Sequence, residues 1–226
     1  VLGHGQSEIK KVLGNAVNSI DFAIQEEQLG TGHAVGVATN ELADFDGNLI
    51  VLFGDTPFIS ARTMTKIENE CKQADLVVLG FHPQDPTGYG RLVTKNEELI
   101  RIVEHNDAND EELAITLCNS GVMAGSALLI KKLLNELDRN NKNNEIYLTD
   151  CIELANTEGL NSTYLTCDPT EALGINSLQQ LADAEKRFQQ TARSVALNNG
   201  IHLVAPETVF FSLDTDLGQD TVIEPN

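Results

Sequence analysis

Short apolar runs alternate with segments of helical periodicity along much of the chain. Residues 48–53 (Asn-Leu-Ile-Val-Leu-Phe) and 76–79 (Leu-Val-Val-Leu) are continuous apolar runs, which are typical of strands covered on both faces in a parallel sheet. Between them, Ser60 is a predicted helix cap, and Ile67 lies on the apolar face of the helix that follows. Strand, helix and strand in this order predict an α/β fold.

The remaining elements of the first three quarters of the chain follow from the same patterns. Residues 91–94 and 99–103 read as a hairpin inserted into the parallel scheme, with its turn at Lys95-Asn96. The other predicted elements are a strand at 19–25, helices at 33–42 and 128–137, and a short helix that Thr149-Asp150 caps and that runs through Ala155. A polar stretch, 138–144, follows the second of these helices.

A long helix is predicted near the end of the chain. Ser177 and Gln180 have the spacing of a capping box, and the apolar positions continue to about Asn198. Beyond Gly200 the helical pattern ends. The sequence therefore predicts a helix of several turns between the α/β region and the C-terminal residues.

A six-residue period appears after this helix. Phe211, Leu217 and Ile223 recur at that interval, and a hexapeptide period is typical of a parallel β-helix. Two periods are also compatible with a pair of short antiparallel strands, so both interpretations stay open at this point. One coil cannot bury its own apolar face, because a solenoid needs neighbouring coils.

The charge of the chain excludes two classes of partner. Among 226 residues, 34 are acidic and 15 basic, which gives a formal net charge of -19. Nucleic acids and anionic membrane surfaces need clustered Lys and Arg, so neither is expected. Hydrophobic residues make up 41% of the chain, enough for a sizeable core.

The cysteines and the first residues suggest a compartment and a longer protein. The four cysteines form no Cys-x-x-Cys pair, so we expect reduced thiols in a reducing, cytoplasmic environment. No apolar stretch approaches the roughly 20 residues that span a bilayer. The chain begins with Val1 rather than Met, and residues 1–5 read as the end of a strand and its turn, so we expect the natural protein to begin earlier.

Two loops have residues suited to binding anions and metals. Gly30-Thr31-Gly32 precedes a predicted helix, where free backbone N–H groups can bind an anion. The alternative is a plain helix cap by Thr31. Asp55 follows an apolar strand, where a carboxylate can hold Mg²⁺, although it could simply form a turn with Pro57.

Several further residues have functional interpretations that spacing leaves open. The Gly-rich stretch 85–91 could approach a flat ligand closely, or could be only a turn that enters the hairpin. Glu104, Asn119 and Asn176 are singly typical of turns and caps. Together they offer acceptors for hydroxyl groups and a second oxygen ligand for a metal.

Taken in order, these segments resemble one protein family. The matching stretches are 28–34 (Gln-Leu-Gly-Thr-Gly-His-Ala), 52–57 (Leu-Phe-Gly-Asp-Thr-Pro), 85–91 (Asp-Pro-Thr-Gly-Tyr-Gly-Arg), 102–104 (Ile-Val-Glu), 119–121 (Asn-Ser-Gly), 147–150 (Tyr-Leu-Thr-Asp) and 174–176 (Gly-Ile-Asn). Over nearly its whole length the chain resembles the bacterial bifunctional enzymes with N-acetylglucosamine-1-phosphate uridyltransferase and glucosamine-1-phosphate N-acetyltransferase activities. The order and spacing of the stretches carry this resemblance.

The resemblance implies a fold and domain boundaries. The expected fold is an α/β, Rossmann-like (GT-A-like) nucleotidyltransferase with a mixed sheet flanked by helices, followed by a linker helix and the first turn of a left-handed parallel β-helix. The implied domains are an N-terminally truncated uridyltransferase domain at 1–177, a linker helix at 178–199 and the start of the acetyltransferase β-helix at 200–226. In the family, the full-length protein is a homotrimer; the assembly state of this chain stays open.

The resemblance also implies a reaction. A uridylyl group passes from UTP to N-acetylglucosamine-1-phosphate, giving UDP-N-acetylglucosamine and pyrophosphate for peptidoglycan and lipopolysaccharide synthesis, and full-length members also acetylate glucosamine-1-phosphate with acetyl-CoA. Mg²⁺ would be held by Asp55 and Asn176, the two residues expected to act in catalysis. The substrate-binding positions would be Gln25, Gly30, Thr31, Phe53, Gly54, Asp55, Gly90, Glu104, Asn119 and Asn176.

The sequence departs from this family at one important motif. The family's Gly-x-Gly-Thr-Arg loop and the following Lys, which grip the triphosphate, do not occur in the chain. We therefore expect an internal piece of a longer protein, weak or inactive alone. Two alternatives stay open: a protein that binds sugar nucleotides without turning them over, and a nucleotidyltransferase for another sugar 1-phosphate.

Overall fold

A computed structural model describes residues 1–14, 19–42, 45–137 and 145–225 of the chain. Their contacts divide the chain into two compact units, Val1–Leu173 and Gly174–Asn226. The predicted polar stretch 138–144 lies outside the described residues.

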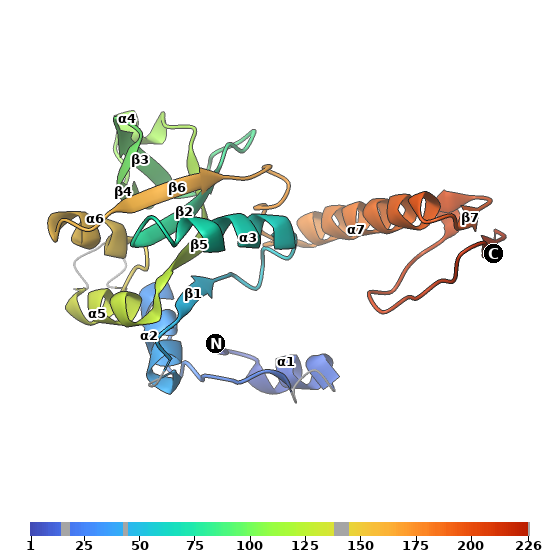
Figure 1. The fold of residues 1–226 in the computed structure, drawn as a ribbon, viewed down its shortest axis with the longest axis horizontal. Coiled ribbons are helices and arrows are strands. Elements are labelled where there is room, and N and C mark those ends of the chain that lie inside the picture. The colour runs from blue at the N-terminus through green and yellow to red at the C-terminus, as the bar shows by residue number, and fades with distance from the viewer. Residues whose placement is uncertain (15–18, 43–44, 138–144, 226) are drawn as a thin grey trace. The chain divides into compact units, whose positions relative to one another are not determined.

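A six-stranded mixed sheet forms the centre of the first unit (Figure 1). Its path is β4 (Glu98–Val103), β3 (Arg91–Lys95), β5 (Cys118–Ser126), β2 (Leu76–Phe81) and β6 (Ser162–Thr166), and β1 (Asn48–Val51) pairs additionally with β5. β2 and β6 are parallel, whereas the pairings of β1, β2 and β3 with β5, and of β3 with β4, are antiparallel. The sheet is therefore mixed, as expected.

The nine-residue strand β5 pairs with two different strands along one of its edges. β1 occupies the part from Met123 to Ser126, and β3 reaches only Cys118. Residues 119–122 of β5 therefore lie between the end of β1 and the start of β3. We call this stretch the β5 gap.

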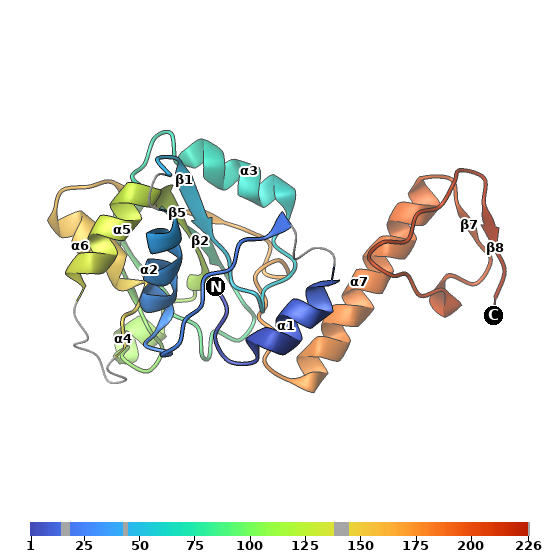
Figure 2. The same ribbon diagram turned by 90° about the horizontal axis from the view of Figure 1, so that it is seen from below.

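Helices cover both faces of the sheet because side chains alternate along β2. Leu76 and Val78 join a cluster with Val35 of α2 (Thr31–Glu41) and apolar residues of α5 (Ala127–Glu136) and α6 (Asp150–Thr157). Val77 and Leu79 point the other way, toward Ile67 of α3 (Ala61–Glu70). Figure 2 shows α3 on one side of β2 and β5, and α2, α5 and α6 on the other. Each fully buried aliphatic side chain contributes about 1.5–3 kcal/mol.

Local hydrogen bonds confirm the predicted cap and hairpin. The Ser60 hydroxyl accepts a hydrogen bond from the Thr63 N–H at the start of α3. The turn between β3 and β4 lies one residue later than predicted, at Asn96 and Glu97, whose φ angles are 51° and 69°. Positive φ at both central positions is typical of a tight hairpin turn that matches strand twist.

Two strand predictions are wrong in part. No strand forms over residues 19–25, where a single bridge joins Ile24 to Leu2. A strand needs a neighbour along its length to satisfy its backbone groups, and here Leu2 alone supplies one. The run 48–53 does form β1, but it is antiparallel and only half-buried rather than covered on both faces of a parallel sheet.

Two further helices complete the first unit. α1 (Gln6–Leu13) begins after Gly5 and buries none of its residues. α4 (Asp110–Leu113) is a single turn with a full capping box, in which Asn109 and Glu112 exchange side-chain and backbone hydrogen bonds. The predicted helices at 33–42 and 128–137 are confirmed as α2 and α5.

In the second unit, a 21-residue helix, α7 (Leu178–Asn198), packs against the segment that follows it. The Ser177 hydroxyl caps it by accepting from the Gln180 N–H, as predicted. The return bond differs from a capping box, because the Gln180 side chain accepts from the Asn176 N–H at 2.7 Å. Gln189 is buried. Its side-chain NH₂ donates to the Phe211 carbonyl at 2.8 Å, and its side-chain oxygen accepts from the Phe211 N–H at 2.7 Å.

The residues of the six-residue period pack inward. Phe211, Leu217 and Ile223 lie against the buried cluster of Ala196, Ile201 and Leu203. β7 (His202–Leu203) and β8 (Val222–Ile223) pair in parallel, so the alternative of two antiparallel strands is wrong. The 3₁₀ turn η2 (Pro206–Thr208) lies between them.

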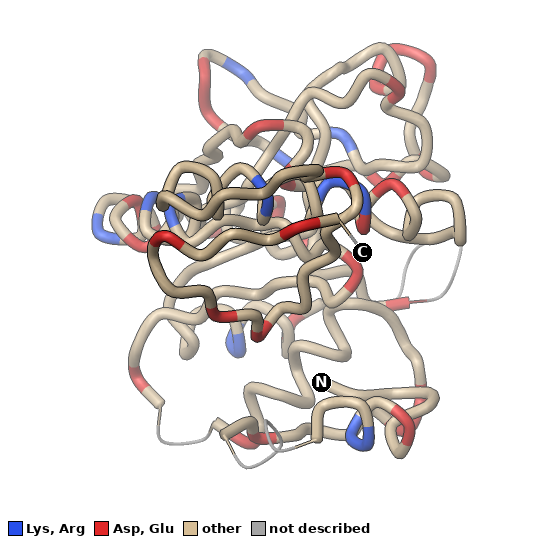
Figure 3. Tube along the Cα trace, turned by 90° about the vertical axis from the view of Figure 1, so that its right-hand side faces the viewer, with Lys and Arg blue, Asp and Glu red and all other residues tan. Residues whose placement is uncertain are grey.

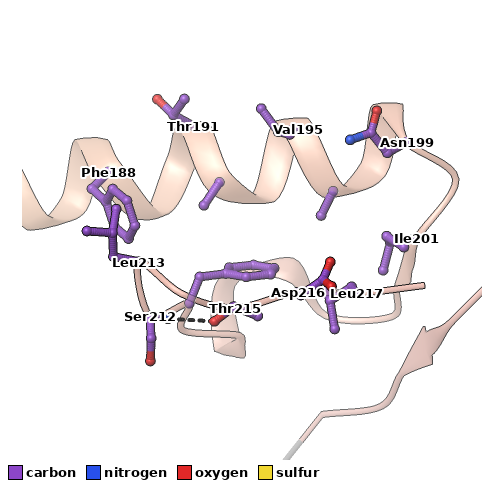
Figure 4. A pocket seen from close by; sticks show the side chains of 13 residues that line it. Phe188, Thr191, Val195, Asn199, Ile201, Ser212, Leu213, Thr215, Asp216 and Leu217 are labelled. Atoms are coloured by element: carbon purple, nitrogen blue, oxygen red, sulfur yellow. Dashed lines mark hydrogen bonds between the residues drawn. The ribbon is translucent and has the colours of Figure 1, made fainter. Parts of the chain in front are cut away.

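A groove of about 330 Å³ lies between α7 and residues 211–217 of the second unit. Figure 4 shows Val195 and Phe188 on the helix side of it and Leu213 and Leu217 on the loop side. No predicted site residue lines this groove.

Acidic residues are spread along the described part of the chain (Figure 3). Asp and Glu positions occur throughout the trace, with fewer Lys and Arg between them (Figure 3). All four cysteines are free; Cys118 and Cys151 are buried, and the other two are half-buried. Burial comes first among the causes that raise the pKa of Cys151 to about 12. Within the described residues no helix is long and apolar enough to cross a membrane.

Candidate functional site

Phe53 and Gly121 meet at one end of the β5 gap. Gly121 has a φ of 86°, and a Cβ on it would lie 2.7 Å from Cε2 of the Phe53 ring. Such a separation is too short for any side chain, so only glycine allows the ring to lie here. Phe53 follows β1, and its carbonyl accepts from the N–H and the hydroxyl of Thr56. Gly54 and Asp55 between them are exposed.

Two side chains in the β5 gap bond to nearby backbone groups. The Asn119 Oδ1 accepts from the Gly121 N–H at 3.0 Å, and the Ser120 Oγ accepts from the Val122 N–H at 3.2 Å. The Ser120 hydroxyl also donates to the Leu79 carbonyl, beside the irregular register between Val78 and Gly80. The Gly121 N–H thus fixes the amide oxygen of Asn119, and this bond also sets the direction of the Asn119 NH₂ group.

Gly90 and Glu104 lie at the other end of the β5 gap. The Gly90 carbonyl accepts from the Asn119 N–H at 2.9 Å. A Cβ on Gly90 would lie 3.4 Å from Oε2 of Glu104. Three predicted site residues from three separate strands or strand ends (Gly90, Glu104 and Asn119) are therefore neighbours.

The Glu104 carboxylate is held by Thr149. The Thr149 hydroxyl donates to Oε1 of Glu104 at 2.9 Å. Burial raises the pKa of Glu104, and the bond from Thr149 opposes that rise. Thr149 precedes α6 as predicted, but its side chain makes no cap bond, because its hydroxyl serves Glu104 instead.

Asp150, the first residue of α6, adds a second partly buried carboxyl. Burial first, and then the charges of Glu104, Glu153 and Asp107, raise the pKa of Asp150 from 3.8 to about 6. This part of the site is therefore strongly acidic and partly shielded from water.

Gln25, Gly30 and Thr31 form a second group of predicted site residues. The buried Gln25 side chain bonds to the Gly30 carbonyl at 3.2 Å and to Nδ1 of His33 at 3.0 Å. Gly30 has a φ of 104° and lies against the backbone of Ile146. Gly30, not Thr31, is the residue before α2, and no side chain caps that helix. The alternative interpretation of Thr31 as a plain cap is therefore wrong.

Residues 145–149 connect the two groups. The Ile146 carbonyl accepts from the Gly32 N–H, and the Leu148 N–H donates to the Thr31 hydroxyl at 3.1 Å. One residue later, Thr149 reaches Glu104. The loop before α2 and the Glu104 group are thus joined through a short run of backbone.

The two predicted metal ligands lie in different units. Asp55 is exposed in the first unit, and no hydrogen bond or ion pair to it occurs among the described residues. Asn176 is exposed in the second unit, where its N–H donates to Gln180. Among the residues described, no group of three or more His, Cys, Asp and Glu side chains gathers to hold a metal. The pairing of Asp55 with Asn176 therefore stays a prediction.

Two residues at the site were not among the predicted site positions. Thr149 lies in a stretch that carries the resemblance, yet its bond to Glu104 depends on the approach of α6 to the end of β4. Arg91 is 2% exposed, although arginine is a residue type that is mostly exposed. Neither the Thr149–Glu104 contact nor the burial of Arg91 has a local sequence signal.

Solved structures of sugar-nucleotide enzymes share this fold. A UDP-glucose pyrophosphorylase complexed with UDP-glucose matches with a TM-score of 0.60 and 17% identity, over 84% of this chain and 80% of that one. A nucleoside-diphosphate-sugar pyrophosphorylase from Vibrio cholerae RC9 matches with a TM-score of 0.58 and 15% identity, over 80% and 77%. The first unit therefore has the Rossmann-like mixed sheet of sugar-phosphate nucleotidyltransferases. No protein-family profile matches the chain.

Curated relatives are more similar in sequence. The bifunctional protein GlmU of Roseobacter denitrificans is 48% identical over 226 residues, which is 100% of this chain and 50% of that protein. The protein of the same name from Cereibacter sphaeroides is 48% identical over 219 residues, 97% of the chain and 48% of that protein. The chain is thus similar over its whole length to proteins named GlmU, and it spans about half the length of the curated relatives it matches.

Proposed function

We propose that the chain is part of an enzyme that transfers a uridylyl group from UTP to N-acetylglucosamine-1-phosphate. The products are UDP-N-acetylglucosamine and pyrophosphate. The observation that carries this proposal is the meeting of Gly90, Glu104 and Asn119 around the β5 gap. Relatives named GlmU and a fold shared with sugar-nucleotide pyrophosphorylases support it.

The chemistry of the Glu104 group suits a sugar. The Glu104 carboxylate accepts hydrogen bonds, and the Asn119 NH₂ donates them, so together they match hydroxyl and acetamido groups. Bidentate and charge-assisted bonds of this kind orient a ring as well as bind it. In the proposed reaction, a phosphate oxygen of the sugar 1-phosphate forms a bond to the α-phosphorus of UTP. The bond from that phosphorus to the bridging β-phosphate oxygen breaks, and pyrophosphate leaves.

The nucleotide is proposed to bind at the other group. Gln25, Gly30 and Thr31 would contact the uracil, and residues 53–55 would lie beside the ribose and phosphates. Alignment of the two substrates would account for most of the rate enhancement, because the reaction needs no covalent enzyme intermediate. Residues 145–149 would keep the two subsites in register.

Mg²⁺ is proposed as the metal, held by Asp55 and Asn176. An exposed carboxylate and a side-chain amide oxygen are hard donors, which suit Mg²⁺ and leave room for phosphate oxygens. The ion would neutralise charge on the phosphates, which a chain of net charge -19 otherwise repels.

The second unit is proposed to begin a left-handed parallel β-helix. The domains would then be a uridyltransferase domain at 1–177, a linker helix at 178–199 and the β-helix start at 200–226. The parallel pair β7–β8 and the inward hexad residues support this proposal. Acetylation of glucosamine-1-phosphate with acetyl-CoA, a homotrimer and a cytoplasmic location are proposals for the whole protein.

The test measures pyrophosphate release by the native protein that contains this chain, used at its full length. UTP is offered with N-acetylglucosamine-1-phosphate, glucose-1-phosphate or galactose-1-phosphate. We expect turnover with the N-acetylated sugar, dependent on Mg²⁺, and its loss in Asp55→Ala. Preference for another sugar phosphate would replace the proposed substrate, and binding of UDP-N-acetylglucosamine without turnover would favour a non-catalytic binder.

A further inference from the structure

In the peptide group between Tyr89 and Gly90, the carbonyl oxygen accepts a hydrogen bond, whereas the N–H has no partner among the described residues. The Tyr89 carbonyl accepts a hydrogen bond from Nη1 of Arg91. Gly90 is buried, yet within the described part of the chain its N–H donates no hydrogen bond. Buried backbone N–H groups are almost always paired, so this one is expected to have a ligand or water as its partner.

Arg91 is an unusual residue to find in this place. Its side chain is 2% exposed, its Nε has no partner, and the described residues offer it no ion pair. Burying a guanidinium costs several kcal/mol unless it is compensated. If this side chain only filled space, an apolar side chain of similar volume would do so without the desolvation cost of a guanidinium.

The surroundings of Gly90 leave this peptide little freedom. The Gly90 carbonyl accepts from Asn119 at 2.9 Å, and the Tyr89 ring packs edge-on against Phe81 with ring centres 4.9 Å apart. No peptide bond among the described residues is cis, and in a trans peptide the C=O and N–H bonds point in opposite directions. Arg91, by holding the Tyr89 carbonyl, therefore also sets the direction of the Gly90 N–H.

We propose that Arg91 is a positioning residue for the sugar substrate. It aims the Gly90 N–H at an oxygen of the sugar 1-phosphate, next to Glu104, whose Oε2 lies 3.4 Å from the Cβ position of Gly90. This inference rests on the proposed function, because it needs a sugar phosphate at this subsite. A charged donor on the carbonyl also polarises the peptide and strengthens its N–H as a donor.

Steady-state kinetics of the longest native protein test this role, with Arg91→Met as the main variant. Loss of an oriented N–H donor should raise KM for the sugar phosphate about tenfold and leave KM for UTP within about twofold. Arg101→Met is the matched control, since Arg101 lies in the neighbouring strand β4 and pairs with Glu112 instead. It should lower the melting temperature and leave both KM values within about twofold.

The outcomes separate this inference from the proposed function. No turnover by the unmodified protein with any sugar phosphate contradicts the proposed function. Turnover with an unchanged sugar KM in R91M, or with both KM values raised equally, overturns the positioning role alone.

A second measurement covers the case in which R91M does not fold. The Gly90 amide signal is followed by ¹⁵N NMR while N-acetylglucosamine-1-phosphate is added to the unmodified protein and to Arg91→Lys. The positioning role predicts a shift of this signal in the unmodified protein and a smaller one in R91K. An unmoved Gly90 signal, or an equal shift in both proteins, overturns it.

Discussion

Gly121→Ala should destabilise the first unit and misplace Phe53. Gly121 has a φ of 86°, a region that costs an L-residue about 1–2 kcal/mol. The new Cβ would also lie 2.7 Å from the Phe53 ring, whereas ordinary contacts begin at 3.4 Å, so the ring must retreat by 3.4 − 2.7 = 0.7 Å. Overpacking of this kind typically costs about 1–3 kcal/mol. The two costs together give a loss of about 2–5 kcal/mol.

Gly159→Ala separates the strain from the clash. Gly159 has a φ of 78° and nothing within 4 Å of its Cβ position, so this variant should lose only the strain of about 1–2 kcal/mol. The difference between the two alanine variants measures the cost of moving the ring. Because Phe53 is proposed to lie beside the ribose, G121A should also raise KM for UTP, which G159A should not.

The assay is urea unfolding of this chain, followed by far-ultraviolet circular dichroism, together with UTP kinetics of the longest native protein. Equal losses of unfolding free energy in both variants would refute the close packing of Phe53 on Gly121. A large stability loss in G121A with an unchanged KM for UTP would retain the packing and refute the nucleotide contact.

Three further changes test other contacts. Because the pKa of Asp150 is raised from 3.8 to about 6, its ionisation destabilises the fold as pH rises through that window. Asp150→Asn should therefore gain stability above pH 6, on the order of 1 kcal/mol for a half-exposed group, and lose the gain below about pH 4. Thr149→Val removes the donor that lowers the pKa of Glu104, so the acid limb of sugar-phosphate turnover should move to higher pH. Gln189→Leu leaves both backbone groups of Phe211 without their partner, and should cost the second unit about 2–3 kcal/mol.

A specific result would contradict each prediction, and two of the changes have a control variant. A difference in melting temperature between D150N and the unmodified chain that does not change with pH would contradict the raised pKa of Asp150. Thr157→Val removes a hydroxyl that serves only the Leu154 carbonyl and should not move the pH profile; an unmoved profile in T149V counts against the Glu104 contact. Gln190→Leu alters an exposed neighbour, and equal amide exchange in it and Q189L would contradict the clamp on Phe211.

Local signals in the sequence were sufficient for the hairpin and for α2, α3, α5, α6 and α7, whereas α1 and α4 were not predicted. The caps at Ser60 and Ser177 join residues three apart, so a short stretch contains the whole interaction. The partner of a strand, in contrast, lies far along the chain. For that reason the apolar run in β1 predicted a strand but not its antiparallel, half-buried position, and the pattern at 19–25 could not show that only Leu2 lies beside it.

The site residues also divide into those that the sequence indicated and those that only the folded structure reveals. Gly90, Glu104 and Asn119 were assigned through the family resemblance, and the structure brings them together. Arg91 was missed because its importance comes from burial, and Thr149 because its contact with Glu104 joins distant parts of the chain. An arginine or a threonine has no local pattern that separates these cases from an ordinary exposed side chain.

The β5 gap explains why this stretch of sheet suits a binding site. A continuous strand on that edge would use the N–H and C=O groups of alternate residues in this stretch for its ladder. Here β1 and β3 stop at opposite ends, and the Asn119 side chain accepts from the Gly121 N–H instead, while Ser120 bonds to the Val122 N–H and to the Leu79 carbonyl of β2. Near the break, the Asn119 NH₂, the Glu104 carboxylate and a Gly90 N–H that is unpaired among the described residues lie within one small region. The sheet thus carries polar groups fixed by its own rigidity, which is the preorganisation that precise binding of a sugar phosphate requires.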